Sequence, residues 1–205
     1  RWYYSSQNGA VVVSTNGPNS TPTAAAPDGW GGDTLSFVMP FEIYRHGALD
    51  AAGSGCTTAL GCTYLIAGTT RVWETLTGAI PRTSWYANSP NLTKGTLGNR
   101  SFINQLAHAT KTPSVAIAGT NDGNVQVGFG LNQGAANSAT WINVTAANAV
   151  LPNRPVMDVA IDVGNAATPA ASAIGYAALG GFDQNTPATP GHVYQLVCTN
   201  QCATF

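Results

Sequence analysis

The stretch Val115-Ala-Ile-Ala-Gly-Thr-Asn-Asp-Gly-Asn-Val125 has the pattern of a strand, a turn and a returning strand. An earlier stretch, Tyr64-Leu-Ile-Ala-Gly-Thr-Thr-Arg-Val-Trp73, shares Ile-Ala-Gly-Thr before its own turn. Aliphatic and small residues on both sides of a polar, Gly-containing turn are typical of a β-hairpin. The pattern decides the fold class because it recurs along the chain.

Two further copies extend the repeat. Tyr176-Ala-Ala-Leu-Gly-Gly181 returns through His192-Val-Tyr-Gln-Leu-Val197, and Trp2-Tyr-Tyr-Ser-Ser-Gln-Asn-Gly-Ala-Val-Val-Val13 is the first copy. The copies are about 50 to 60 residues apart, at the upper end of the range for four-stranded propeller blades. Another strand precedes each internal copy, at residues 37–43, 102–107 and 156–162.

These repeats predict an all-β fold, a β-propeller with about four blades. The predicted units are a partial first blade at 1–35 and blades at 36–100, 101–150 and 151–205. Alternation along the repeated strands predicts that six side chains pack within or between blades and take no part in recognition. They are Trp73, Val115, Ile117, Val159, Ile161 and Tyr194.

The composition restricts the partners. The chain has 205 residues, of which 44% are hydrophobic and 8% charged, and its net charge is −1. Without a cluster of Lys and Arg there is little to bind a phosphate backbone or an anionic membrane surface, so we expect no nucleic-acid partner. No apolar run approaches the roughly 20 residues of a spanning helix, so we expect no membrane insertion.

The cysteines form two close pairs, Cys56/Cys62 and Cys198/Cys202. Each pair lies in turn-forming sequence, which predicts two small disulfide loops and a secreted or extracellular protein. A four-thiolate metal site is the alternative, but these spacings are not the Cys-x2-Cys of zinc ribbons. We therefore expect no metal, and because no phosphate loop or dinucleotide fingerprint appears, we expect no cofactor. Four Asn-x-Ser/Thr sequons, at Asn19, Asn91, Asn99 and Asn143, are candidate glycosylation sites.

A family resemblance follows from three longer runs. Residues 151–162, residues 175–182 with His192-Val-Tyr-Gln, and Ala139-Thr-Trp-Ile-Asn-Val-Thr145 resemble sortilin/xyloglucanase-like propellers with sialidase-type repeats. Blades of that group usually carry the Asp-box turn, Ser-x-Asp-x-Gly-x-x-x-x-Trp. Here the turns are degenerate: Thr75-Leu-Thr-Gly78 leads to Trp85, and Leu131-Asn-Gln-Gly134 leads to Trp141. Because the box carboxylate normally bonds within its own turn, its replacement by Thr77 indicates turn variation.

The resemblance also implies an incomplete ring, because propellers of this type generally close with more blades than the chain supplies. Arg1 enters within a blade, and Phe205 stops before an outer strand. An open arc would leave apolar faces and strand edges in water. We therefore expect the remaining propeller blades, or a neighbouring protein chain, as partners.

Catalysis by a glycoside hydrolase of the xyloglucanase-like type needs two carboxylates that flank a sugar ring. The best local candidates are Asp28 and Asp33 in Asp28-Gly-Trp-Gly-Gly-Asp33, with Glu42 a strand later. The alternative is a Gly-rich loop with solvated carboxylates, which we favour because fold resemblance does not carry function. A sialidase is disfavoured because no Arg lies in the Arg-Ile-Pro setting of that family.

The remaining function is binding. Loops at 14–35, 86–100 and 183–191 are rich in Asn, Thr, Pro and Gly, and such loops on a rigid scaffold suit carbohydrate or protein contacts. The aromatic residues Trp30, Trp85 and Tyr86 are the candidates for ligand binding. The sequence thus predicts a secreted or cell-surface propeller that is a binding or structural module, with polysaccharide as a candidate ligand and a polysaccharide hydrolase as the alternative.

Overall fold

A computed structural model describes residues 1–45, 56–57, 61–145, 149–182, 184 and 186–198. Within these residues the chain forms β-strands joined by turns and short 3-10 segments, without an α-helix. The prediction of an all-β fold is therefore confirmed. The 3-10 segments are η1 (Asp28–Gly32), η2 (Arg82–Ser84), η3 (Gly98–Arg100) and η5 (Pro169–Ala171).

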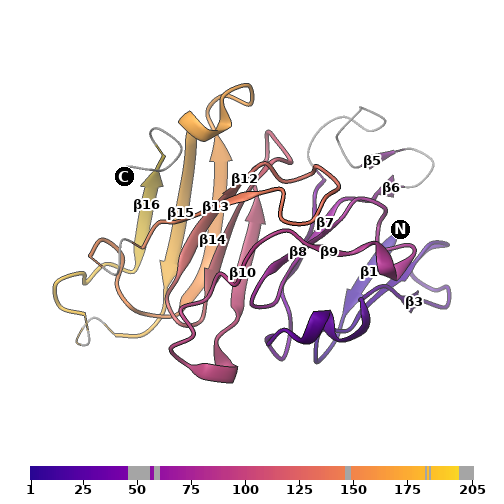
Figure 1. The fold of residues 1–205 in the computed structure, drawn as a ribbon, viewed down its shortest axis with the longest axis horizontal. Coiled ribbons are helices and arrows are strands. Elements are labelled where there is room, and N and C mark those ends of the chain that lie inside the picture. Colours follow the sequence, from indigo (N-terminus) through magenta and orange to yellow (C-terminus); the bar gives the residue numbers. More distant parts are fainter. Residues whose placement is uncertain (46–55, 58–60, 146–148, 183, 185, 199–205) are drawn as a thin grey trace.

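Apart from one two-stranded hairpin, the described strands form four small antiparallel sheets that follow one another in sequence and along the long axis (Figure 1). The first sheet has β1 (Trp2–Ser5), β2 (Val11–Ser14) and β3 (Thr23–Ala24). The second has β4 (Phe41–Ile43), β7 (Leu65–Gly68), β8 (Val72–Thr75) and β9 (Tyr86–Ala87). The third has β10 (Ile103–His108), β11 (Val115–Thr120), β12 (Val125–Phe129) and β13 (Thr140–Asn143). The fourth has β14 (Val156–Val163), β15 (Ala173–Leu179) and β16 (Val193–Val197).

Local turn chemistry sets the first hairpin. Asn8 and Gly9 lie between β1 and β2 with φ of 59° and 73°. Asn and Gly tolerate this left-handed region better than other residues, and two consecutive positive φ values match the twist of the flanking strands. The register then pairs Tyr3 with Val13, so that both side chains lie on the face turned toward the second sheet.

Each pair of consecutive sheets shares one apolar core. Between the first and second sheets, Val11 and Val13 pack with Leu65, Ala67 and the aromatic side chains of Trp30, Trp73 and Trp85. Between the second and third, the core contains Ile66, Val72, Ile103 and Leu106. Between the third and fourth it contains Val115, Ile117, Val156 and Val159. Burying one such aliphatic side chain contributes about 1.5–3 kcal/mol, so these cores hold the stack together.

The six side chains predicted to pack do so. Val115 and Ile117 are fully buried, and Trp73, Val159 and Ile161 are between 6% and 9% exposed. Tyr194 is half-buried and packs against the core between the third and fourth sheets. Their packing is thus confirmed, whereas their place in propeller blades and their lack of a role in recognition stay predictions.

The sheets repeat one another in register. Gly68 pairs with Val72, Gly119 with Val125, and Ala178 with Val193, so these pairs occupy equivalent positions. In the second and third sheets, the residue after the fourth strand donates its amide hydrogen to an equivalent carbonyl. Asn88 N donates to Val72 O at 2.8 Å, and Val144 N donates to Val125 O at 3.0 Å. Residues equivalent by register therefore have equivalent partners.

In the second and third sheets, one tryptophan at the outer strand bonds to the sheet before it. Trp85 Nε1 donates to Ala25 O at 2.7 Å, and Trp141 Nε1 donates to Asn88 O at 3.0 Å. Ala25 and Asn88 are themselves equivalent, because each follows the last strand of its sheet. The same indole-to-carbonyl hydrogen bond is thus repeated at the first two interfaces between sheets.

One disulfide is present among the described residues. Cys56 and Cys62 face each other across the hairpin of β5 (Cys56–Thr57) and β6 (Gly61–Cys62), with the sulfur atoms 2.10 Å apart. The predicted first disulfide is confirmed. Cys202, half of the predicted second pair with Cys198, lies outside the described residues.

Candidate functional site

The Gly-rich loop that contains Asp28 and Asp33 packs against the second sheet, and both carboxylates form ion pairs with arginines. Asp28 Oδ1 lies 2.8 Å from Arg82 Nη1 at an exposed position. Asp33 Oδ1 lies 2.8 Å from Arg71 Nη2, and Arg71 Nε also donates to both Asp33 oxygens. Sequence reasoning did not anticipate either partner, since each arginine is distant in the chain.

Asp33 is the centre of a hydrogen-bond network. Thr69 Oγ1 donates to its Oδ2 at 2.6 Å, and Trp73 Nε1 donates to the same oxygen at 3.0 Å. Burial alone would raise the pKa of Asp33, but the bonds from Arg71, Thr69 and Trp73 together lower this pKa below its ordinary value. A carboxylate so fully bonded ties the loop to the turn between β7 and β8. It is poorly suited to be a proton donor.

The predicted ligand-binding tryptophans are inside the core. Trp30 is 2% exposed, Trp85 is 6% exposed, and their rings meet edge to face with centroids 5.2 Å apart. Trp30 Nε1 donates to Gly9 O at 2.8 Å, and Gly9 leaves room for the indole because a Cβ there would lie 2.7 Å from Nε1. Buried this way, neither ring leaves a face open for stacking a sugar.

Tyr86 is half-buried and bonds to a carboxylate that the sequence analysis did not select. Its hydroxyl donates to Glu74 Oε1 at 2.7 Å. Burial, followed by the charge of Glu74, raises the pKa of Tyr86 far above its ordinary value. Tyr86 is therefore a neutral donor to Glu74.

Glu74 and Asn88 form a buried polar network between the second and third sheets, and both residues are 0% exposed. Asn88 Nδ2 donates to Glu74 Oε2 at 2.6 Å, and the Asn132 amide donates to Oε1 at 2.8 Å. Burial raises the pKa of Glu74, although these donors oppose the shift. A Glu within Val72-Trp-Glu-Thr75, on a strand covered on both faces, is the sequence signal that could have found this network.

Glu42 has different bonding partners from Asp28 and Asp33. Its Oε2 accepts a hydrogen bond from the His108 amide at 2.7 Å and lies 3.4 Å from His108 Nδ1. The His108 ring is buried against Tyr44 and Tyr64, with centroids 5.5 and 4.8 Å away. Glu42 also lines a pocket of about 210 Å³ with Phe41, Ile43 and Arg45. Glu42 is therefore a candidate carboxylate that lines a pocket.

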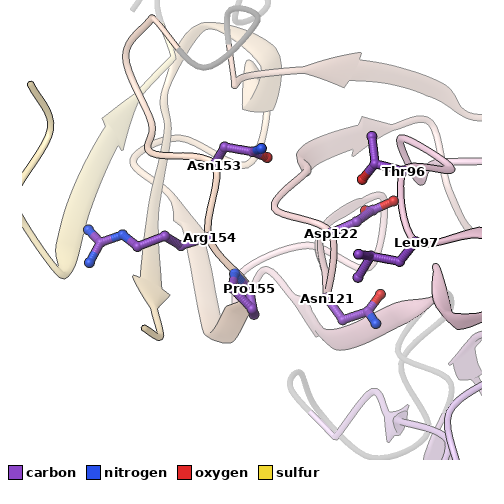
Figure 2. A pocket seen from close by; sticks show the side chains of 7 residues that line it. All are labelled: Thr96, Leu97, Asn121, Asp122, Asn153, Arg154 and Pro155. Carbon is purple, nitrogen blue, oxygen red and sulfur yellow. The ribbon is translucent and has the colours of Figure 1, made fainter. Parts of the chain in front are cut away.

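A second pocket, of about 150 Å³, lies beside the turn between β11 and β12 (Figure 2). Asp122 Oδ1 accepts from Thr120 Oγ1 at 2.5 Å, and its other oxygen is enclosed. The Arg154 guanidinium points away from the pocket (Figure 2) and donates to the Gly191 and Thr189 carbonyls. One enclosed carboxylate does not make the pair that glycoside hydrolysis needs. The lining residues are Thr96, Leu97, Asn121, Asp122, Asn153, Arg154 and Pro155.

All four sequon asparagines are exposed. Asn91 Oδ1 accepts from the Thr93 amide and hydroxyl, at 2.9 and 2.8 Å, and Asn143 Oδ1 accepts from the same groups of Thr145. Their glycosylation stays a prediction.

In the described part of the chain, no group of three or more His, Cys, Asp or Glu side chains is arranged to hold a metal ion. Nor does that part contain a helix with the length and hydropathy needed to cross a bilayer. No protein-family model matches the sequence, and no curated protein matches it significantly.

Proposed function

We propose that the chain is part of a secreted or cell-surface β-propeller and is a binding or structural module. The observation that carries the proposal is the repeated stacking of four antiparallel sheets, in which the first strands β10 and β14 make the most extensive contacts between sheets. Adjacent first strands are what blades around a common axis would have. The disulfide between Cys56 and Cys62 is weakly consistent with an extracellular site.

The ion pairs of the candidate carboxylates Asp28 and Asp33 favour a binding function over catalysis. Asp28 and Asp33 are paired with Arg82 and Arg71, and the lowered pKa of Asp33 keeps it ionised. A glycosidase needs one carboxyl to hold a proton beside a second that is ionised. The alternative, a polysaccharide hydrolase, rests on Glu42, which faces a pocket beside Arg45.

Binding and hydrolysis can be distinguished by testing the chain with soluble β-glucans, including xyloglucan. We expect the chain to be retarded in gels that contain a polysaccharide ligand, or to bind none if its role is structural, and in neither case to release new reducing ends. Release of reducing ends that disappears in the Glu42→Gln variant would establish the hydrolase instead. Because Glu42 is partly exposed, this variant should fold normally.

A further inference from the structure

The outward face of the fourth sheet is apolar at positions that are buried in the sheets before it. Ile174, Tyr176 and Val193 are 37%, 45% and 68% exposed. Counting along the strands from the register pair Ala178–Val193 gives their counterparts in the second and third sheets. These counterparts are at most 1% exposed, and they are Tyr64, Ile66, Val72, Val115, Ile117 and Val125.

At the turn end of the second strand, this repeated face has a small residue, Gly68, Gly119 or Ala178. The first strand of the next sheet passes directly over the two glycines. A Cβ on Gly68 would lie 2.7 Å from Ile103 Cγ2, and a Cβ on Gly119 would overlap the Val156 side chain. A small residue is therefore required at these two positions, where the next sheet lies over the strand.

The covering strands share one chemistry. Ile103 is followed three residues later by Leu106, and Val156 by Val159, with a register shift between the two positions of each pair. In both interfaces the Ile or Val side chain and the second aliphatic side chain flank the glycine. The strands β10 and β14 therefore share the register shift, the three-residue spacing and the aliphatic type of the two side chains.

We propose that Ala178, with Ile174, Tyr176 and Val193 around it, is the docking surface for the first strand of a further antiparallel sheet. The partner strand carries Ile or Val over Ala178 and Leu or Val three residues later. This inference rests on the stacked-blade function proposed above, and it names the surface and the chemistry of the partner. Its basis is continuity with the interfaces between the second and third sheets and between the third and fourth sheets, because the second, third and fourth sheets share one register.

The test uses the whole chain followed, through a Gly/Ser linker of about 20 residues, by a second copy of residues 101–205. The second copy supplies β10 as the covering strand. Two proteins carry Ala178→Cys, one in the first copy and one in the last, and the rate of thiol labelling is measured at low protein concentration. Cys and Ala are similar in size, so the variants should fold alike.

We expect labelling in the first copy to be at least tenfold slower than in the last copy, and the single chain with Ala178→Cys to label as fast as the last copy. Equal rates in the two tandem proteins, whether fast or slow, would overturn the proposal. Such a result would leave the polysaccharide experiment unaffected, so failure of this surface can be told apart from failure of the binding function.

Discussion

Replacing Asn88 with Ala is expected to lower the free energy of unfolding by about 3 kcal/mol or more. Asn88 is fully buried and bonds in both directions: its Nδ2 donates to Glu74, and its Oδ1 accepts from the Ser138 amide and hydroxyl and the Ala139 amide. Ala would leave several buried polar groups without partners. Urea denaturation followed by tryptophan fluorescence measures the change.

Asn91→Ala is the matched control. Asn91 is exposed and bonds within its own turn, so its loss should cost much less than that of Asn88. A loss below about 1 kcal/mol for Asn88→Ala would mean that the network between the second and third sheets is not formed as described.

Gly119→Val is the second substitution with a large expected effect. The new side chain would enter the space that Val156 and Val159 occupy, and the backbone of β14 would have to move away. Overpacking of this kind typically costs 1–3 kcal/mol, and we expect a value at or above the upper end. Thermal or urea unfolding measures it.

The control is Ala178→Val at the equivalent position of the fourth sheet. Ala178 is half-buried on the outward face, so the added methyl groups should change stability by roughly 0.5 kcal/mol or less. Equal losses at the two positions would show that Gly119 is no more tightly covered than Ala178, which would contradict the packing of β14 over Gly119.

The strands and their order could be predicted because they depend on local pattern. Ile-Ala-Gly-Thr recurs before two turns, and both copies form strands with the same register. The packing of Val115 and Ile117 followed from alternation. The closure of the sheets into a propeller depends on contacts that the repeat does not encode, and it stays a proposal.

The side-chain partners could not be predicted, because they join residues far apart in the chain. Arg71 meets Asp33 and Arg82 meets Asp28 only when the first loop folds onto the second sheet. Trp30 reads as a surface aromatic between glycines, yet those glycines adopt positive φ and bring the indole into the core. Glu74 was missed because polar residues on strands usually face solvent.

The measurement that tests the stacked-sheet account most directly is the native mass of the 205-residue chain, at protein concentrations well above those used for thiol labelling. Exposed Tyr176, Val193 and Ile174 on one end of the stack, and Trp2 and Tyr4 on the other, should not remain in water uncovered. The account predicts association into species heavier than 21.1 kDa, or loss of solubility. A soluble, cooperatively folded monomer of 21.1 kDa would contradict it.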